Sequence, residues 1–201
     1  MPQAGQKQHV DLFRKLMLRR RLLRDALPGP AYVPFCGDGD IANELYTDRQ
    51  VYAADLDADR VENAQSAMPS AVVRQADCDS WPFPDLDLPP FTVCDFDSYA
   101  DPYASFRSFW QNADKASTVC LLFTDAQRGN IFLNGRFTHP DGSKVQIDTD
   151  IRNEKRRIYN FYFRKTVLPW FNAYIAPYRV KKTPFYHRNY NMLYWGAIVE
   201  L

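Results

Sequence analysis

The sequence predicts a doubly wound α/β fold, in which helices cover both faces of a mostly parallel sheet. Short apolar segments alternate with segments of helical period from residue 31 to residue 124, which is the pattern of βαβ units. The segment 118–124 is nearly all apolar, as expected of a central parallel strand. The first apolar segment runs directly into a glycine turn at Gly37 and Gly39. The 201 residues fit one domain of this kind.

Residues 1–30 are expected to form a basic amphipathic helix that precedes the main domain at 31–201. Helical spacing between 7 and 27 places six apolar side chains on one stripe: Val10, Phe13, Met17, Leu18, Leu22 and Leu27. Five basic side chains are expected largely outside that stripe: Arg14, Lys15, Arg20, Arg21 and Arg24. Pro28-Gly29-Pro30 then ends the helix.

The main domain begins with five strands that alternate with helices. We expect the strands at 31–35, 51–54, 71–76, 91–94 and 118–124. We expect the helices at 41–46, 58–67 and 102–113. Four prolines between residues 81 and 90 predict a loop before the fourth strand.

The C-terminal part of the chain departs from this regular alternation. Asn134-Gly135 and Asp141-Gly142 are turn signals, so residues 131–150 are expected to form a hairpin-like insertion. Helical periodicity covers 152–172, and Pro169 is expected to kink or end the regular part. Two strands near 178–186 and 191–200 close the chain, and the last strand is expected to insert antiparallel into the sheet.

Charge is distributed unevenly along the chain. Residues 31–101 carry fifteen acidic and three basic side chains, whereas residues 151–201 carry ten basic and two acidic ones. Residues 1–30 are also basic. This asymmetry can steer an anionic substrate toward the two ends of the chain. The alternative is that these charged faces are only solvated.

Cysteine spacing and hydropathy bear on the compartment. The four cysteines lie far apart, which favours buried thiols in a reducing environment over a disulfide framework or a zinc site, and no metal is expected. No apolar stretch approaches the ~18 residues needed to span a bilayer. We therefore expect a soluble cytoplasmic protein with no membrane partner.

Polar side chains at three strand ends form the candidate cofactor site. Around Phe35, the residues Gly37, Asp38 and Gly39 allow the backbone to approach a ligand closely. The next strand ends in Asp55-Leu56-Asp57, where a carboxylate can accept the hydroxyl groups of a ribose; Asp55 is favoured over Asp57 because it directly ends the apolar run. Asp77 and Cys78 follow the third strand, where a polar group can face an adenine edge or simply cap a turn.

The candidate catalytic segment follows the fourth strand. Asp95 and Asp97 can accept a hydrogen bond from an amine or hold its proton, and Tyr99 or Tyr103 can stack on a base. The alternative is a polar turn capped by Pro102. Near the C-terminus, thirteen of the thirty aromatic residues are mixed with basic ones, a composition that suits either nucleic-acid contact or a packed core. His187 and Arg188, in the turn between the last strands, are candidate substrate contacts.

These segments resemble the class I S-adenosylmethionine-dependent methyltransferases. Residues 33–40 are similar to the D-P-F-x-G-x-G-T signature of amino-group methyltransferases, with Val33 at its first acid and Asp40 at its threonine. Residues 95–102 are similar to the D-x-D-P-F-G-S-P stretch of the tRNA guanine-N2 dimethyltransferases, with Ser98 at its first proline and both acids kept.

The resemblance implies S-adenosylmethionine as cofactor and methyl transfer to an exocyclic amine of a nucleic acid, with RNA preferred over DNA. It also implies that Phe35, Gly37 and Gly39 enclose the methionine end of the cofactor, that Asp55 holds the ribose and that Asp77 holds the adenine. Because Val33 replaces the first acid, Asp38 or Asp40 becomes the candidate contact for the methionine amino group.

Three other functions fit parts of the sequence. A methyltransferase for a small metabolite would agree with the acidic centre of the chain. An NAD-dependent oxidoreductase would agree with the loose glycine pattern, although 201 residues leave little room for a separate substrate region. A catalytically silent binding protein of the same fold would agree with Val33 and Ser98.

Overall fold

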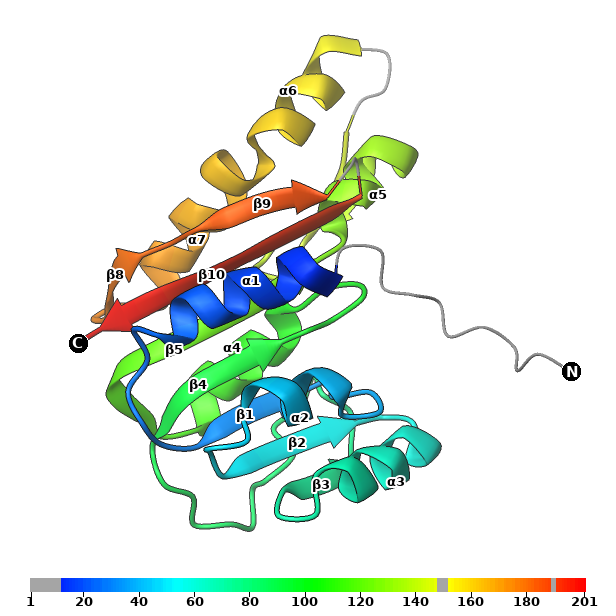
Figure 1. Cartoon of the computed structure of the whole chain (residues 1–201). Helices are drawn as coiled ribbons and strands as arrows, with labels where there is room; N and C mark the ends of the chain where they lie inside the picture. The colour runs from blue at the N-terminus through cyan, green and yellow to red at the C-terminus, as the bar shows by residue number, and fades with distance from the viewer. Residues whose placement is uncertain (1–11, 148–151, 189–190) are drawn as a thin grey trace, which may run out of the picture.

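An eight-stranded sheet forms the centre of the structure, a computed structural model that describes residues 12–147, 152–188 and 191–201. The strands lie in the order β3-β2-β1-β4-β5-β10-β8, and β9 also pairs with β10 (Figure 1). Their bounds are β1 (Ala31–Pro34), β2 (Val51–Asp55), β3 (Val72–Gln75), β4 (Phe91–Phe96), β5 (Lys115–Asp125), β8 (Arg179–Lys182), β9 (Phe185–Arg188) and β10 (Met192–Glu200).

The first five strands are mutually parallel, and β10 runs antiparallel to β5, β8 and β9. Strand order reverses between β1 and β4, because the chain moves outward from β1 to β3 and then returns to the other side of β1. Ligands of open α/β sheets bind at such a switch point, beyond the carboxyl ends of the strands. The predicted doubly wound sheet with an antiparallel last strand is therefore confirmed.

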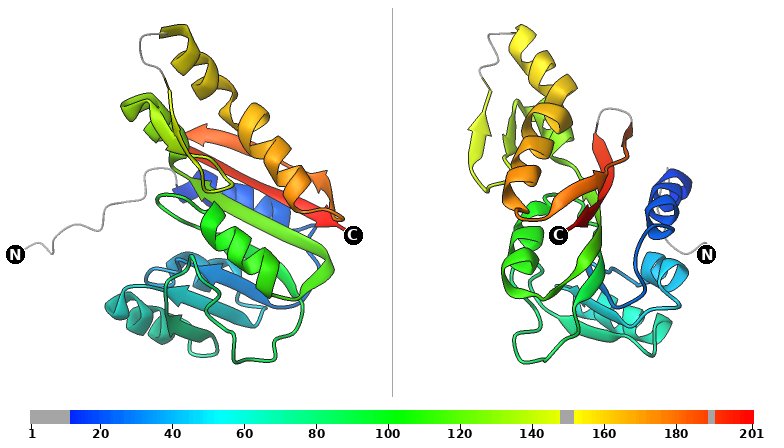
Figure 2. Two further views of the ribbon diagram at one scale, coloured as in Figure 1. Left: turned by 180° about the vertical axis from the view of Figure 1, so that it is seen from behind. Right: turned by 90° about the vertical axis from the view of Figure 1, so that its left-hand side faces the viewer.

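Helices form a layer on each face of the sheet (Figure 2). One face is covered by α1 (Leu12–Leu23), α2 (Asp40–Leu45) and α3 (Ala58–Ala67). The other face is covered by α4 (Tyr103–Asn112), α6 (Arg152–Tyr162), a π-helical turn (Phe163–Val167) and α7 (Leu168–Tyr174). The π-helical turn ends just before Pro169, where the sequence predicts a kink.

The alternation of side chains along the strands builds two different cores. In β5, Leu122 faces the α1 side, whereas Leu121 and Phe123 face the α4 side. The α4 side is rich in aromatic rings, and Phe123 stacks on Trp195 with ring centroids 4.2 Å apart. Six aromatic residues of the C-terminal quarter are buried: Tyr159, Tyr162, Phe163, Phe171, Tyr194 and Trp195. For these six residues, packing is the correct interpretation and base stacking is excluded.

Helix α1 packs with a face that matches the predicted one only in part: Leu18 and Leu22 of the expected apolar stripe are buried. Phe13 and Met17 belong to the expected apolar stripe but are 71% and 51% exposed, while Lys15 and Arg19 are buried. Val10 and Leu27 flank the helix; Val10 lies outside the described residues and Leu27 is exposed. The prediction of an exposed Lys15 is therefore wrong.

Close approach to β10 and two long-range carboxylates explain the rotation of α1. A Cβ atom on Gly196 would lie 2.4 Å from Leu22 Cδ1, so this glycine lets the helix lie directly on the strand. Asp95 and Asp97 at the end of β4 bind the two basic side chains that face the sheet. Neither of these long-range contacts can be predicted from the hydrophobic periodicity of the helix alone.

Two segments of the C-terminal half differ in detail from the prediction. Helix α5 (Gln127–Asn134) occupies the start of the expected insertion, and Gly135 caps it at a φ of 62°. The hairpin is confined to β6 (Arg136–Thr138) and β7 (Lys144–Gln146), with Asp141-Gly142 in its turn; residues 148–151 lie outside the described part. The single strand expected at 178–186 is divided into β8 and β9 at Thr183-Pro184.

Candidate functional site

The turn after β1 has the backbone geometry of a ligand-binding loop. Phe35, Gly37 and Gly39 have φ values of 59°, 55° and 84°. A positive φ is costly for a residue as bulky as phenylalanine, and such strain concentrates at binding sites. A Cβ atom on Gly37 would meet no atom within 4 Å, so the backbone there borders open space.

Asp55 at the tip of β2 supports this turn. Its Oδ2 accepts a hydrogen bond from the backbone N–H of Gly37 at 2.9 Å, and its Oδ1 accepts one from the N–H of Asp57 at 3.1 Å. An ionised carboxylate offers about four acceptor positions, so each oxygen keeps capacity for another donor. Asp55 therefore holds the glycine turn and still presents an acceptor edge to the space beside it.

The other predicted cofactor residues have mostly local contacts. Asp57 caps α3 by accepting from the N–H groups of Asp59 and Arg60. Asp77 accepts from the N–H of Asp79 in a tight turn. Leu56 is exposed at the strand tip. These contacts agree with the capping interpretation of the two aspartates and leave Leu56 accessible to a ligand.

Cys78 is buried and supports the glycine turn through a hydrogen bond. Its Sγ accepts a hydrogen bond from the backbone N–H of Phe35 at 3.3 Å. Burial raises the pKa of this thiol to about 12, so it is neutral at physiological pH. Asp38 lies on the opposite side of the turn and accepts a hydrogen bond from Asn63 Nδ2 at 3.0 Å.

Asp95 at the tip of β4 is enclosed by α1 and α2. Arg19 Nε lies 2.7 Å from Asp95 Oδ2, and Arg19 Nη2 lies 2.6 Å from Oδ1, a bidentate pair between two fully buried side chains. The hydroxyl of Tyr46 donates a further hydrogen bond to Oδ2 at 2.7 Å. These three donors hold Asp95 in place and join α1 to the sheet.

Asp97, two residues further on, forms a second ion pair with α1. Its Oδ2 contacts Lys15 Nζ, and its Oδ1 lies 3.6 Å from Arg19 Nη2. Burial alone would raise the pKa of Asp97, but the positive charges of Arg19 and Lys15 outweigh that effect and keep its pKa below the usual value. Asp97 is therefore ionised at neutral pH. Lys15 Nζ also lies 5.9 Å from the ring centroid of Tyr99.

A cleft of about 330 Å³ joins these strand tips. Seven of the predicted site residues line it: Phe35, Gly37, Asp38, Asp55, Asp95, Asp97 and Tyr99, whose ring is exposed. The predicted residues Gly39, Leu56, Asp57, Asp77 and Cys78 do not line it. Five acidic residues face one basic residue, Arg60, across the lining. The cleft is thus suited to a ligand with positive charge.

Sequence reasoning missed the basic residues of the site. Arg60 comes from the first turn of α3 and lines the cleft. Lys15 and Arg19 reach the acids of β4 from a helix 76 or more residues away in the chain. The sequence did contain a signal for them. Asp95 and Asp97 lie two residues apart at a strand end and need cationic partners if they are buried. Lys15 and Arg19 are spaced i, i+4, so they lie on one face of a helix and can supply both partners.

Of the predicted substrate contacts, Tyr103 is the one whose side chain the structure describes, and it does not line the cleft. Tyr103 is fully buried, and its hydroxyl lies 2.6 Å from Asp125 Oδ2, so it is not available to stack on a base. Tyr99, by contrast, is 63% exposed at the cleft. His187 and Arg188 end β9, and their side chains lie outside the described part of the structure.

Asp125, at the tip of β5, is a third buried strand-end carboxylate. It accepts hydrogen bonds from the hydroxyl of Tyr103 and from the N–H of Gln127, each at 2.6 Å. No basic side chain within the described residues pairs with it. Burial raises the pKa of Asp125 to about 7, so this carboxyl group is largely protonated below neutral pH.

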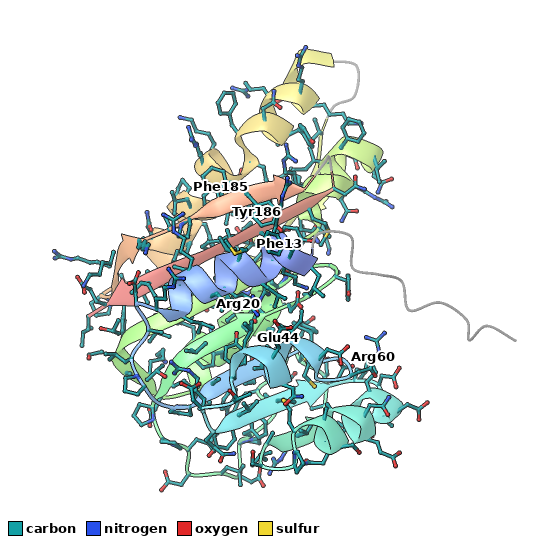
Figure 3. All side chains as sticks on the ribbon, viewed as in Figure 1. Phe13, Arg20, Glu44, Arg60, Phe185 and Tyr186 are labelled. Atoms are coloured by element: carbon teal, nitrogen blue, oxygen red, sulfur yellow. The ribbon has the colours of Figure 1, made fainter. Side chains whose placement is uncertain are left out.

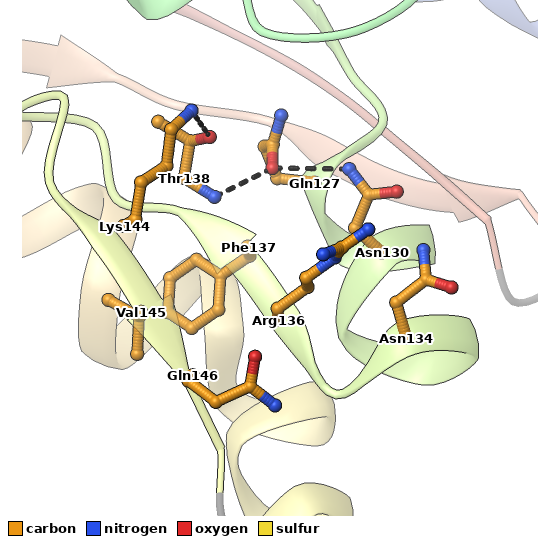
Figure 4. A pocket seen from close by; sticks show the side chains of 9 residues that line it. All are labelled: Gln127, Asn130, Asn134, Arg136, Phe137, Thr138, Lys144, Val145 and Gln146. Atoms are coloured by element: carbon orange, nitrogen blue, oxygen red, sulfur yellow. Dashed lines mark hydrogen bonds between the residues drawn. The ribbon is translucent and has the colours of Figure 1, made fainter.

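A second cavity of about 460 Å³ lies between α5 and the β6–β7 hairpin (Figure 4). Its wall includes Gln127, whose Oε1 accepts hydrogen bonds from the N–H of Thr138 at 2.8 Å and from Asn130 Nδ2 at 3.3 Å. Gln127 Nε2 lies 3.5 Å from the carbonyl oxygen of Ala100, a residue that lines the strand-tip cleft. Gln127 thereby connects the hairpin to one wall of that cleft.

Solved methyltransferase structures have this architecture. TrmN from Thermus thermophilus aligns with a TM-score of 0.54 and 16% identity, over 95% of this chain and 53% of that one. The N-methyltransferase NodS from Bradyrhizobium japonicum WM9 aligns with a TM-score of 0.55 and 10% identity, over 94% of this chain and 96% of that one. The chain therefore has a Rossmann-like methyltransferase fold, and it spans about half the length of TrmN.

The same fold also occurs in a protein with a different activity. The [4+2]-cyclase SpnF aligns with a TM-score of 0.52 and 12% identity, over 92% of this chain and 80% of that one. No family model matches the sequence, and no curated protein matches it. At these identities the comparisons establish the fold, and function must be argued from the cleft.

None of the described helices has the length and apolar character needed to cross a membrane. Within the same residues, no group of three or more histidine, cysteine, aspartate and glutamate side chains is arranged to hold a metal ion.

Proposed function

We propose that the protein is an S-adenosylmethionine-dependent methyltransferase that modifies an exocyclic amine of a nucleic acid, with RNA preferred over DNA. The observation that carries this proposal is Asp55, which holds the glycine turn through Gly37 and retains acceptor positions at the edge of the cleft. A ribose supplies two hydroxyl donors for those positions. The open space beside Gly37 admits the adjoining part of the cofactor.

Charge favours this cofactor over NAD. S-adenosylmethionine carries a sulfonium and an ammonium group, whereas NAD carries two phosphates. Asp38 and Asp40 flank the start of α2, where a dinucleotide would place its pyrophosphate and where neighbouring carboxylates would repel it. The same carboxylates attract the cationic methionine end. NodS, one of the structural neighbours, is known as a complex with S-adenosyl-L-homocysteine.

When bound, the cofactor supplies an electrophilic methyl group, and the protein must align an amine lone pair with it. We assign that task to Asp97, whose charge is maintained by Lys15 and Arg19 and which lines the cleft. As an ionised acceptor it orients the N–H bonds of the amine. Tyr99 offers an exposed ring on which the base can stack.

Asp95 has a different role in this proposal. Its carboxylate is fully buried and receives Arg19 and Tyr46. We therefore assign Asp95 as a positioning residue that fixes α1 and, through Arg19, the ionisation of Asp97. The alternative assignment, Asp95 as a direct substrate contact, requires Arg19 to leave a bidentate buried pair.

The nucleic-acid acceptor is supported by charge outside the cleft, where the first 30 and last 51 residues are strongly basic.

Two other functions have support. An acceptor other than a nucleic acid is favoured by the acidic lining, and BpumL, a neighbour described as a plantazolicin methyltransferase, was solved with a pentazolic desmethylPZN analogue and S-adenosyl-L-homocysteine. A catalytically silent binding protein is favoured by Val33 and Ser98, which depart from the methyltransferase motifs.

Methyl incorporation from isotopically labelled S-adenosylmethionine distinguishes these functions. The full chain is incubated with separate RNA, DNA and metabolite pools, and the products are resolved by mass spectrometry. We expect label in an amino group of RNA. Label only in the metabolite pool would establish the small-molecule function, and no label in any pool with intact cofactor binding would establish the silent one.

A further inference from the structure

A groove of about 590 Å³ lies between the outer face of α1 and strand β9. Part of its surface is apolar: Phe13 and Met17 project from the helix and are exposed, whereas Phe185 and Tyr186 on the strand are half-buried, and Tyr186 stacks on Tyr194 with ring centroids 4.8 Å apart. Figure 3 shows Phe13 on the helix beside the strand that carries Phe185 and Tyr186. Accessible aromatic rings on a soluble surface are a feature of binding sites for other flat groups.

The rim of the groove is cationic. Four exposed arginines of α1 line it: Arg14, Arg20, Arg21 and Arg24. Among the residues that the structure describes, no acidic side chain lines it. Arg20 pairs with Glu44 of α2. The groove therefore combines ring faces with a row of guanidinium groups, which is the pattern that recognises bases and phosphates together.

Helix α1 lines the groove and also contacts two residues that line the cleft, Asp95 and Asp97. Phe13 faces the groove, while Lys15, two residues later, contacts Asp97 and lies near the ring of Tyr99 at the cleft. A chain lying along the outer face of α1 thus passes the end of the helix closest to Tyr99. The basic groove offsets the repulsion that the acidic cleft would exert on a phosphate backbone.

We propose that this groove binds an unpaired nucleic-acid strand and leads one of its bases to the strand-tip cleft; this inference rests on the methyltransferase function proposed above. Stacking on Phe13 and Tyr186 requires exposed base faces, which a duplex hides between neighbouring pairs. The acceptor is therefore single-stranded RNA, such as a loop or a free end. Arg21 and Arg24 contact its phosphates.

Fluorescence anisotropy with a labelled 12-nucleotide single-stranded RNA tests the groove. We compare the full-length wild type with a groove variant, Phe13→Ala with Arg21→Gln and Arg24→Gln, whose side chains are all exposed. The matched control is Arg156→Gln with Arg157→Gln on α6, which lies on the opposite face of the sheet. We expect the groove variant to bind at least tenfold more weakly and the control to bind within about threefold of wild type.

The salt dependence adds a second readout. Loss of two phosphate contacts should lower the slope of log affinity against log salt by about 1.4. The variant with Arg21→Lys and Arg24→Lys keeps both charges and should retain the wild-type slope. Titration with S-adenosylhomocysteine should give the same Kd for wild type and groove variant, because none of the three side chains lines the cleft.

Several results would overturn the inference. These are an unchanged RNA affinity in the groove variant, an equal loss in the α6 control, or tighter binding of a duplex than of the single strand. A wild-type dimer that Phe13→Ala dissociates without changing RNA affinity would assign the groove to a second copy of the chain. Failure of the proposed function is a separate result: RNA binds through the groove, but S-adenosylhomocysteine does not bind to any form of the protein.

Discussion

Two aspartates at strand tips on either side of β1, Asp55 on β2 and Asp95 on β4, are stabilised in opposite ways. Asp55 accepts two backbone N–H groups from its own strand end and the adjacent glycine turn. Asp95 accepts a guanidinium from a helix 76 residues away in the sequence, together with a tyrosine hydroxyl. Backbone donors leave Asp55 with acceptor capacity for a ligand, whereas side-chain donors saturate Asp95.

The comparison distinguishes a ligand-binding carboxylate from a structural carboxylate within one cleft. Strand-end carboxylates look equivalent in a sequence, because each follows an apolar segment. Their partners decide their roles: local backbone N–H groups make a ligand-ready acceptor, and a long-range cation makes a structural anchor. Asp97 is intermediate, since Lys15 and Arg19 set its charge while its position still lines the cleft.

The largest expected effect is on stability and comes from replacing Arg19, the cation that pairs with Asp95. Arg19→Met leaves Asp95 fully buried without its charge partner, and breaking such a pair costs about 3–5 kcal/mol of unfolding free energy. Urea denaturation followed by far-UV circular dichroism measures it. Arg21→Met, at an exposed position of the same helix, is the control and should change stability by no more than about 0.5 kcal/mol. A loss below about 1 kcal/mol for Arg19→Met would contradict the anchor role.

The next largest effect is on turnover and comes from replacing Asp97. Asp97→Asn keeps the shape of the side chain but removes its charge, so turnover should fall by about ten- to 150-fold, the equivalent of the 1.5–3 kcal/mol of a charge-assisted hydrogen bond. Affinity for S-adenosylhomocysteine should stay near the wild-type value. Initial rates with labelled cofactor and calorimetric titration measure the two quantities. Asp79→Asn, an exposed residue outside the cleft lining, is the control; wild-type rates for Asp97→Asn would move the amine contact elsewhere.

A smaller effect tests the third strand tip, where Asp125 accepts hydrogen bonds from Tyr103 and Gln127 but pairs with no cation among the described residues. Its folded pKa of about 7 exceeds that of an unfolded aspartate, so the native state binds the extra proton. The stabilisation from that proton is complete below about pH 4 and is lost as pH rises to about 7. As the pH rises from 5 to 6, the titration of Asp125 should lower the free energy of unfolding by about 1 kcal/mol.

Asp125→Asn removes this titration, so the difference in stability between the variant and the wild type should change with pH by that amount. Urea unfolding at pH 5 and pH 6 gives the comparison. A difference that is independent of pH over this interval would show that Asp125 is ionised in the folded protein.

The sequence was sufficient for those parts of the molecule that depend on local patterns. The alternation of strands and helices and the glycine turn follow from residues close together in the chain. Asp55 could be selected because it directly ends its strand. These features need no knowledge of distant contacts.

The parts that the sequence did not predict depend on contacts between distant segments. The buried face of α1 was assigned correctly at Leu18 and Leu22, but Lys15 and Arg19, the charged residues that Asp95 and Asp97 bind, were not expected on it. Tyr103 was expected at the substrate site, but its partner Asp125 lies on another strand. Helix α5 was missed because the Asn134-Gly135 turn signal marks the end of that helix rather than a hairpin turn.

The central claim is that the edge of Asp55 beside the glycine turn holds the ribose of S-adenosylmethionine. Isothermal titration calorimetry with S-adenosylhomocysteine tests it most directly, using wild type, Asp55→Ala and, as a control, Asp57→Ala at the cap of α3. We predict binding to wild type, a Kd more than tenfold higher for Asp55→Ala, a smaller change for Asp57→Ala, and no heat with NAD. An equal Kd for wild type and Asp55→Ala, or binding of NAD in place of S-adenosylhomocysteine, would contradict the account.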